Sequence, residues 1–406
     1  MDQRRVVVTG LGVVAASGHS VAEFWGNLSN GQSSIGPIEA VDTSSFRIRN
    51  GAEVKNFVPE ELLPGQDLSQ IDRFSQFGVI AAHQAVADAG ITWTDALRLR
   101  TGVFAGTGIG GEVTHDKAYS QLYQENKPRL HPLTIPRIMP NANASAISMV
   151  LGTMGPTQTI TTACASSNHA LGQAFWMVRN GICDMMIAGG SEAPFCTGAL
   201  RGWEALRVVA GDTCRPFSKD RQGLILGEGG AMLVLETLES AMARGARIYG
   251  EIAGFGMSAD AGHITTPDVN GAIRAMAGAL ADAGLDPAQI DYINAHGTGT
   301  MVNDAMETKA IRTLFGDHAD RLAVSSTKSM HGHALGASSA FEAIATILAL
   351  HYGVIPPTAN YNEPDPECDL DVVPNLARRQ DIRYAVSNAF AFGGLNATLV
   401  LKKWVA

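Results

Sequence analysis

The strongest constraint on the fold of this chain is that its two halves resemble each other in sequence. Similar segments recur in the same order: VVVTGLGVVAASG (6–18) and GEIAGFGMSADAG (250–262), HQAVADAG (83–90) and AGALADAG (277–284), GTG at 106–108 and 297–299, and HALG at 169–172 and 333–336. The copies lie 194 residues apart at HQAVADAG and 164 apart at HALG, so the first half carries about 30 extra residues between them. Repetition over this length predicts a duplicated fold.

Each half alternates predicted strands with predicted helices. The segment ICDMMIAGG (182–190) is typical of a buried strand, and apolar residues at helical spacing predict a helix from about 165 to 181. This alternation indicates a layered α/β architecture with pseudo-twofold halves, and its functional site is expected where the halves meet. We divide the chain at 1–249 and 250–406, with a segment of about 112–160 inserted in the first half as a cap or dimer contact.

The composition argues against several classes of protein. Hydrophobic residues make up 46% of the chain and charged residues 17%, which is typical of a well-packed globular protein. The net charge of −9 argues against a nucleic-acid binder. The most apolar helical stretch, 340–350, contains Glu342 and is too short to span a membrane. With no secretory signal and no CxxC pair among the five cysteines, we expect a cytoplasmic protein with reduced thiols.

Cys164 lies where a predicted strand gives way to a predicted helix, in the segment TTACASSNHALG (161–172). The first turn of a helix offers unpaired amides and the positive end of the helix dipole, which we expect to lower the pKa of the thiol. Small neighbouring side chains leave room for a substrate. This arrangement is typical of an activated nucleophile, but a buried, inert cysteine explains the motif equally well.

Histidines in two later motifs favour the catalytic interpretation. NAHGTGT (294–300) places His296 at a strand end, before a Gly-Thr turn. STKSMHGHALG (326–336) places His331 and His333 in the second copy of the strand-to-helix corner. His169, inside the first predicted helix, is expected to have a packing role.

The register of the two HALG copies pairs the cysteine with a lysine. Counted back from the shared histidine, Lys328 falls where Cys164 stands in the first half. A zinc site made by Cys164, His296 and His333 is the rival hypothesis. The three residues come from three separate loops with no short ligand pair, so we expect no metal.

Five motifs together resemble the β-ketoacyl-acyl carrier protein synthases of the elongating type II group, and the nodulation-type ketosynthases most of all. They are TTACASSNHA, DTCRPFSKDRQGLILGEGGAMLVLE (212–236), NAHGTGTMVNDAMETKAI (294–311), SSTKSMHGHALGASSAFE (325–342) and NAFAFGGLNATLVLKK (388–403). The resemblance covers essentially the whole chain. It implies a thiolase-like, duplicated αβαβα sandwich and a homodimer.

The resemblance also implies a decarboxylative condensation that lengthens an acyl chain by two carbons. Cys164 would take the acyl chain from acyl carrier protein as a thioester, and malonyl-carrier protein would then lose CO₂ and attack that thioester. The phosphopantetheine arm belongs to the carrier protein, so no cofactor of the chain's own is expected. The roles implied for the catalytic residues are nucleophile for Cys164, binding of the malonyl oxygen for His296 and His333, tuning of their charge for Lys328 with Glu342, and an oxyanion hole for the amides of Cys164 and Phe392.

Further residues are matched to substrate and partner contacts. The resemblance implies that Thr298 and Thr300 bind the pantetheine arm. It implies that Ile109, Trp203, Phe390 and Thr134 line the acyl pocket. Carrier proteins are acidic, and the candidates for a basic docking patch are Lys127, Arg129 and Arg207, with Arg201 nearby in sequence.

Three departures from the family pattern bear on specificity. His331 stands where relatives have a threonine-like residue, and Ala391 in AFAFGGLN stands where they have a glycine. Leu133 and Thr134 stand where relatives often have aromatic residues near the dimer-facing end of the pocket. Because smaller side chains there would lengthen the pocket, we predict a preference for long or unusual acyl chains.

Two alternatives belong to other functional classes. A thiolase would share the fold but act on CoA esters, and it would normally carry a second catalytic cysteine in the C-terminal half. A non-catalytic chain-length partner subunit would resemble a ketosynthase but lack the nucleophile. The presence of Cys164, His296 and His333 argues against the second alternative.

Overall fold

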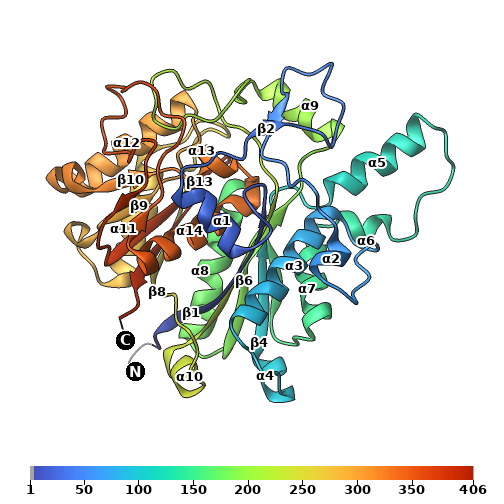
Figure 1. Ribbon diagram of the computed structural model, residues 1–406, viewed down its shortest axis with the longest axis horizontal. Helices are drawn as coiled ribbons and strands as arrows, with labels where there is room; N and C mark the ends of the chain where they lie inside the picture. The colour runs from blue at the N-terminus through green and yellow to red at the C-terminus, as the bar shows by residue number, and fades with distance from the viewer. Residues whose placement is uncertain (1–3, 406) are drawn as a thin grey trace.

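The computed structural model describes residues 4–405 and is built around one ten-stranded sheet (Figure 1). The order of strands along the sheet is β10 (Ala323–Ser325), β9 (Tyr292–Asn294), β13 (Tyr384–Ala391), β14 (Leu395–Lys403), β8 (Gly250–Ala259), β1 (Val6–Ala15), β7 (Gly229–Thr237), β6 (Met185–Glu192), β4 (Thr101–Gly106) and β5 (Thr157–Ile160). This order is symmetric about the antiparallel pair of β1 and β8. The predicted duplication is therefore confirmed, with β5, β4, β6 and β7 as counterparts of β10, β9, β13 and β14.

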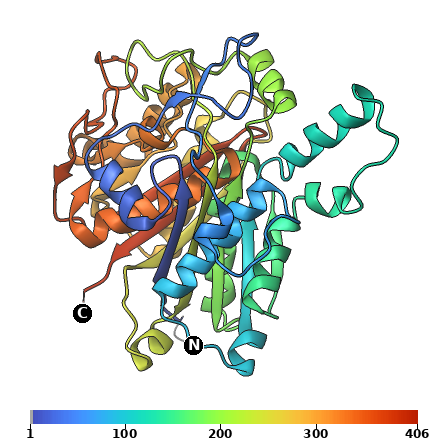
Figure 2. The same cartoon turned by 45° about the vertical axis from the view of Figure 1, so that its right-hand side comes forward.

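The main helices form three layers around the two half-sheets (Figures 1 and 2). They are α8 (Ser166–Arg179) and α14 (Ser338–Tyr352) in the centre, α3 (Arg73–Asp88) and α7 (Ala142–Leu151) outside the first half, and α11 (Val269–Ala283) and α12 (Met301–Phe315) outside the second. Along β14, Leu399 and Leu401 enter the central core, whereas Val400 enters the outer one. Because both faces of the sheet are covered, its strands are almost entirely apolar. The result is the predicted αβαβα sandwich.

The helix predicted from about 165 to 181 is confirmed as α8, and α14 is its counterpart in the second half. The remaining α-helices and strands are α1 (Val21–Ser29), α2 (Pro59–Leu62), α4 (Asp95–Arg100), α5 (Glu112–Tyr123), α6 (Thr134–Ile138), α9 (Thr197–Leu206), α10 (Leu238–Ala243), α13 (Lys328–His331), and the small strands β2 (Gly36–Pro37), β3 (Asn50–Gly51), β11 (Val354–Ile355) and β12 (Arg378–Arg379). Within residues 4–405, no helix has the length and apolar character needed to cross a membrane.

The two helix-initiating turns show that the register inferred from HALG is wrong. A short 3₁₀ turn, Ala163–Ala165, precedes α8, and the same turn, Leu335–Ala337, precedes α14. Both turns begin with a residue of positive φ, 50° at Ala163 and 46° at Leu335. The counterpart of Cys164 is therefore Gly336, not Lys328. The HALG match misled because its first copy lies inside α8, whereas its second copy comes before α14.

Packing explains why the second turn has a glycine where the first has a cysteine. A Cβ atom at Gly336 would lie 2.3 Å from the amide nitrogen of Gly108 and 2.5 Å from the carbonyl carbon of Thr107. The backbone after β4 thus occupies the space that a side chain at Gly336 would need. Only the first turn has room for a reactive side chain, although the backbones are alike.

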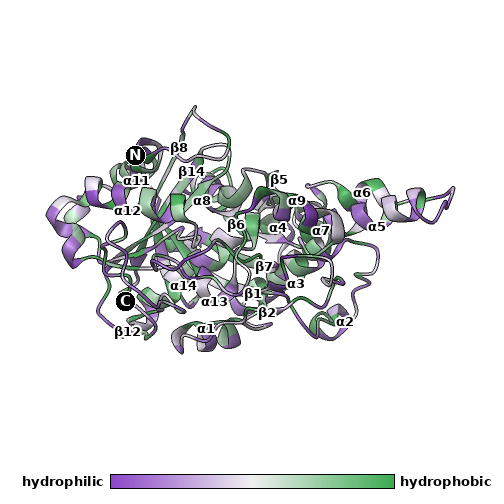
Figure 3. Ribbon diagram, turned by 90° about the horizontal axis from the view of Figure 1, so that it is seen from above, coloured by the Kyte–Doolittle hydropathy of each residue, from purple (hydrophilic) through white to green (hydrophobic). Residues whose placement is uncertain are grey.

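Part of the inserted segment projects from the body of the protein. α5 and α6 form an arm that extends away from the layers (Figures 1 and 3). By contrast, α7 packs on the sheet and β5 is its edge strand, so the projecting part is shorter than the 112–160 assigned from sequence. The arm exposes large apolar side chains, with Tyr123 72% and Ile135 59% exposed, and Met149 near the C-terminal end of α7 is 74% exposed.

Replacing Gly336 by alanine tests the close packing of the second turn. We expect Gly336→Ala to lower the free energy of unfolding by about 1–3 kcal/mol, because backbone atoms must move to admit the methyl group. Gly278→Ala in α11 is the control, since its Cβ would meet only the Cα of Gly256, at 3.7 Å. That change should stabilise the helix by about 0.5–1 kcal/mol. Thermal unfolding measures both, and a Gly336→Ala protein as stable as the parent would contradict the packing argument.

Candidate active site

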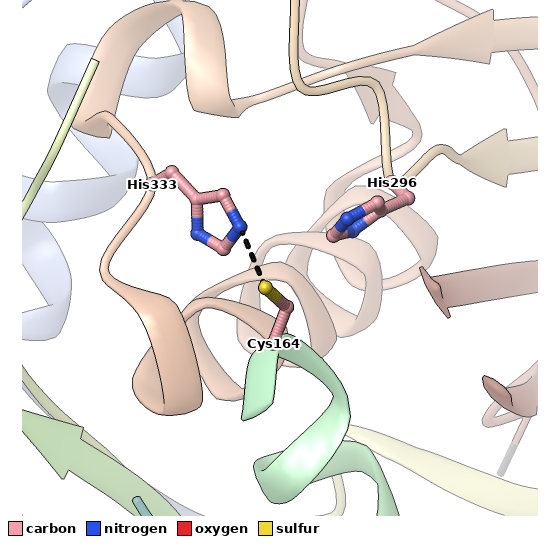
Figure 4. Close-up of side chains that lie close together, drawn as sticks. All are labelled: Cys164, His296 and His333. Atoms are coloured by element: carbon pink, nitrogen blue, oxygen red, sulfur yellow. Dashed lines mark hydrogen bonds between the residues drawn. The ribbon is translucent and has the colours of Figure 1, made fainter. Parts of the chain in front are cut away.

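A cavity of about 440 Å³ lies where the two half-sheets meet, and both halves contribute to its walls. Cys164 comes from the first half, and His296 and His333 come from the second. Figure 4 shows the three side chains pointing toward one another, with Cys164 at the start of the helical segment that leads into α8. The predicted location of the site between the halves matches this cavity.

Cys164 is nearly buried, with 7% of its surface exposed. Backbone amides of Cys164 itself and of Phe392 donate toward the sulfur, and the ammonium of Lys328 adds a favourable charge. Burial outweighs these contributions and raises the pKa of the thiol to about 11. The expectation of a lowered pKa is therefore wrong. Loss of hydration destabilises the thiolate by more than the amides at the helix end and the charge of Lys328 stabilise it.

His333 follows α13 in the turn that leads to α14, and its Nε2 lies 3.1 Å from the Sγ of Cys164. The other ring nitrogen, Nδ1, accepts a hydrogen bond from the amide of Leu335 at 3.1 Å and lies 2.8 Å from the hydroxyl of Ser338. An amide can only donate, so Nδ1 carries no proton in the neutral ring. His333 therefore presents an Nε2–H to the cavity and to the sulfur.

His296 lies in the loop that follows β9. The carboxylate of Glu307 accepts the amides of His296 and Gly297, at 2.9 and 2.8 Å, and so fixes the loop. The Nδ1 of His296 lies 3.3 Å from the ammonium of Lys328, which can only donate. The neutral ring of His296 thus carries its proton on Nε2, as that of His333 does. The two rings are perpendicular, with centroids 5.6 Å apart.

A fully buried ion pair sets the charge around these rings. The ammonium of Lys328 binds the carboxylate of Glu342 and also donates to the carbonyl oxygen of His296, at 2.7 Å. Burial first, and then the positive charge of Lys328, hold the pKa of His296 and of His333 well below the usual value of 6.5. Both histidines are therefore neutral near pH 7 and act as paired N–H donors.

The comparisons with known proteins agree with this geometry. The family description of the β-ketoacyl synthase N-terminal domain matches residues 3–241, and that of the C-terminal domain matches residues 249–362. The chain belongs to the β-ketoacyl synthase family. The predicted resemblance to this family is therefore confirmed, and the protein is an acyltransferase.

Individual relatives cover almost the whole ketosynthase chain. Nodulation protein E of Rhizobium meliloti is 48% identical over 400 residues, which are 98% of this chain and 99% of that protein. 3-Oxoacyl-[acyl-carrier-protein] synthase 2 of Staphylococcus aureus is 43% identical over the full length of both. Among solved structures, the ishigamide ketosynthase/chain length factor has a TM-score of 0.96 and 40% identity, with 99% of this chain and 100% of that chain covered. A type II polyketide acyl-carrier protein in complex with its ketosynthase has a TM-score of 0.91 and 34% identity, with both chains fully covered.

Most of the residues matched to substrate contacts line the cavity of the ketosynthase, and two do not. Thr298, Thr300, Trp203, Phe390 and Phe392 are all among its lining residues. Ile109 is outside the lining and packs in an apolar cluster with Leu335. Thr134 lies on the projecting arm, where its hydroxyl donates to the carbonyl oxygen of His131 at 2.7 Å. A single chain therefore does not bring Thr134 to the cavity.

The basic residues expected to bind a carrier protein are not gathered in one patch of this chain. Arg207 lines the mouth of the cavity. Lys127 and Arg129 are exposed on the arm, and Lys127 pairs with Glu125 at 2.6 Å. Arg201 pairs with Glu204 and lies over the ring of Phe46. Of these residues, Arg207 alone is next to the cavity.

The three grouped side chains also meet a geometric criterion for a metal site. The ligand atoms of Cys164, His296 and His333 all lie within 4.8 Å of one another. The ammonium of Lys328 is 3.3 Å from the Nδ1 of His296, and its positive charge would repel a metal ion bound at these residues. The direct contact between the sulfur and the Nε2 of His333 also fits a hydrogen bond.

The segment 263–267, which none of the sequence motifs includes, forms part of the cavity wall. It is bound to the loop that carries Phe392, because the amide of Gly393 donates to the carbonyl oxygen of Ile264 at 2.7 Å. Ala391, just before this loop, is the last residue of β13 and has no positive φ. Alanine therefore fits there without strain, while Gly393 and Gly394, at φ 82° and 68°, make the turn.

His331 is buried beneath the site rather than in the cavity wall. Its ring packs near Phe24 and Phe341, with centroids 6.1 and 5.5 Å away, and its Nε2 lies 3.0 Å from the hydroxyl of Thr327. Burial and the charge of Lys328 lower the pKa of His331 to about 3, so the ring is neutral. These contacts indicate a packing role.

Replacing Lys328 tests how the histidines are kept neutral. A lowered pKa means that a histidine gains its second proton only well below pH 6.5, so the rate of malonyl decarboxylation should stay constant as the pH falls through 6.5. Lys328→Ala removes a positive charge that lowers both pKa values, so the acid limb of the profile should move to higher pH. Release of CO₂ from malonyl-carrier protein, followed between about pH 5 and 8, measures this.

Lys309→Ala, an exposed lysine of α12, is the matched control and should leave the profile unchanged. An acid limb centred near pH 6.5 in the parent protein would contradict the argument.

Replacing His331 tests whether it has a role in specificity. We expect His331→Thr to lower the free energy of unfolding by about 1–3 kcal/mol, because the smaller side chain leaves a void beside Phe24 and Phe341. The distribution of product chain lengths should not change. Thermal unfolding and product analysis measure the two effects, and altered chain lengths would show that His331 acts on the acyl pocket.

Proposed function

We propose that this ketosynthase is a 3-oxoacyl-[acyl carrier protein] synthase that extends acyl chains by two carbons. The observation that carries the proposal is the contact between a thiol and a neutral imidazole N–H, with Sγ of Cys164 3.1 Å from Nε2 of His333. The second N–H donor, His296, faces the same cavity. The ion pair of Lys328 and Glu342, which sets the charge around both histidines, is fully buried.

The first step would transfer an acyl chain to Cys164. The sulfur attacks the thioester carbonyl of the acyl-carrier protein, a new carbon–sulfur bond forms, and the bond to the pantetheine sulfur breaks. The thiol proton leaves with the departing pantetheine thiol. The amides of Cys164 and Phe392 point to the region of the sulfur, where the oxyanion of the tetrahedral intermediate develops.

The second step would form the new carbon–carbon bond. Malonyl-carrier protein loses CO₂, and the electron pair of the broken bond moves into an enolate whose oxygen is bound by the Nε2–H groups of His296 and His333. The enolate carbon then attacks the acyl thioester, and the sulfur of Cys164 leaves. Neutral donors stabilise the developing negative charge without consuming a proton.

The substrate would be delivered by the carrier protein and bound at the mouth of the cavity. The phosphopantetheine arm belongs to the acyl carrier protein, so the chain needs no cofactor of its own. Thr298 and Thr300, whose hydroxyl oxygens are 2.9 Å apart, line the cavity where the arm would bind. We infer that Arg207 contacts the acidic carrier protein at this mouth.

We also propose a homodimer and a cytoplasmic location. The exposed apolar side chains of the arm, which include Tyr123 and Ile135, support a partner there because water would otherwise surround them. A second copy on this face would bring Lys127 and Arg129 near another subunit. The five cysteines are free and buried, as expected for a reducing compartment.

Long or specialised acyl chains are the proposed substrates. Leu133 and Thr134 are smaller than the aromatic residues expected in relatives, and they lie on the arm. They could widen an acyl pocket only where two subunits meet. The 48% identity to nodulation protein E supports a specialised role over a general one.

Two alternative functions make different demands on the site. A thiolase would use CoA esters and a second reactive cysteine, but the only cavity-lining cysteine within residues 4–405 is Cys164. A chain-length partner subunit would lack the nucleophile. The thiol of Cys164, held between two amides and His333, favours an active enzyme.

Mass spectrometry of the protein after incubation with acyl-carrier protein tests this proposal. We expect one acyl group on Cys164, and we expect Cys164→Ala to lose the adduct and the condensation activity. Cys183→Ala replaces a buried cysteine between α8 and β6 that does not line the cavity, and this variant should retain both. An intact protein that acquires no adduct from a competent donor would overturn the assignment.

The same reaction with mixed medium-chain and long-chain donors tests the chain-length proposal. Long-chain donors should be transferred and extended preferentially. Acyl-CoA donors added in place of the carrier protein distinguish the thiolase alternative, which predicts that they react faster.

A further inference from the structure

Glu192, the last residue of β6, is a buried carboxylate that the condensation mechanism does not use. It has no exposed surface and no lysine or arginine partner among the described residues. Four donors bind it instead: the hydroxyl of Thr107 at 2.9 Å and the amides of Gly108 at 2.5 Å, Ile109 at 3.2 Å and Gly336 at 2.9 Å. A buried carboxylate with this many backbone donors holds those backbones together.

The position of Glu192 has a counterpart at the reactive centre. β6 and β13 are equivalent strands of eight residues each, so Glu192 corresponds to Ala391. At the first turn, the amides of Cys164 and of Phe392, the residue after Ala391, donate toward the thiol. At the second turn, the amide of Gly336 donates to Glu192. The amide of the second turn therefore also meets an anionic group, and that group is a carboxylate of the chain itself.

The bonds of Glu192 connect both reactive turns. On one side, the hydroxyl of Ser166 shares its proton between the carbonyl oxygens of Ala163, at 2.6 Å, and Thr107, at 3.2 Å. It also accepts the amide of Thr162 at the start of the Cys164 turn. On the other side, Gly336 follows Leu335, whose amide fixes the protonation of His333. Glu192 thus bonds directly to the backbone of the second turn and reaches that of the first turn through Thr107 and Ser166.

We propose that Glu192 is a positioning residue of the condensation site, whose carboxylate holds the Cys164 turn and the His333 turn in register across the boundary between the two halves. This inference rests on the proposed function, because the sulfur and the Nε2 of His333 must lie together for the reaction. Glu192 touches no reacting atom, and it holds the two turns through Thr107, Gly108, Ile109 and Gly336.

The negative charge of Glu192 affects the pKa of the Cys164 thiol, which a purely structural role would leave unchanged. Burial raises the pKa of Glu192 to about 7, and its negative charge contributes to the raised pKa of Cys164. Removing the charge should therefore lower the pKa of the thiol. Alkylation of Cys164 by iodoacetamide, measured against pH, follows this directly and needs no carrier protein.

The experiment compares Glu192→Gln and Glu192→Asp with a matched control. Glu236→Gln removes another buried carboxylate, on the neighbouring strand β7. Glu236 lies beside Met185, at the opposite end of β6 from Glu192. In Glu192→Gln, we expect acyl transfer to Cys164 to slow by about 10-fold to 100-fold, with the KM for the donor changed by less than about twofold. Glu192→Asp should recover part of the rate, and Glu236→Gln should retain it.

The alkylation profile of Glu192→Gln should shift to lower pH, while that of Glu236→Gln should stay in place. A folded Glu192→Gln protein with the parent's rate of acyl transfer and the parent's alkylation profile would overturn the proposal. If Glu192→Gln does not fold, Thr107→Val removes only the hydroxyl donor, and an unchanged acyl-transfer rate in that variant would overturn it equally. A parent protein that alkylates at Cys164 but accepts no acyl group would instead count against the proposed function.

Discussion

The reactive centre depends on the packing of α8 against α14 between the two half-sheets. This contact brings the turns at the starts of the two helices together, and the amide of Asn168 on α8 donates to the hydroxyl of Ser339 on α14 at 2.9 Å. The nucleophile comes from the first turn, and the histidine comes from the approach to the second. Because each half supplies only one side of the cavity, neither half could form the site without the other.

Duplicated backbones have acquired different chemistry at the two turns. At the first turn there is space for the side chain of Cys164, and two amides point to its sulfur. At the second, the backbone of Thr107 and Gly108 excludes any side chain at Gly336, and Glu192 takes the amide. One corner is left open to bind an external oxyanion, whereas the other is closed by an internal one. The second corner serves as a support for the first.

The sequence located the reactive residues better than it described their environment. Cys164, His296 and His333 lie in short motifs at strand or helix ends, which made them candidates, whereas the roles of Lys328 and Glu342 came from the family resemblance. The pKa of Cys164 was predicted in the wrong direction because burial depends on distant segments such as 263–267 and the Phe392 loop. The HALG repeat gave the wrong counterpart for Cys164, since four matching letters do not encode whether they lie inside a helix or before it. Ile109 and Thr134 were expected at the pocket, but their side chains lie in an apolar cluster and on the arm.

The sequence by itself determined the duplication, the alternation of strands and helices, and the identity of the groups that carry the chemistry, because these depend on periodicity and on residue type. The tertiary structure alone decided the protonation of the two histidines, the complete burial of the Lys328–Glu342 pair that the family resemblance implied, and the part played by Glu192. Each of these depends on donors and charges that are distant in the chain, such as Gly336, which is 144 residues from Glu192. Electrostatic effects in a buried site follow distance in space and exclusion of water, and neither is written in a local stretch of sequence.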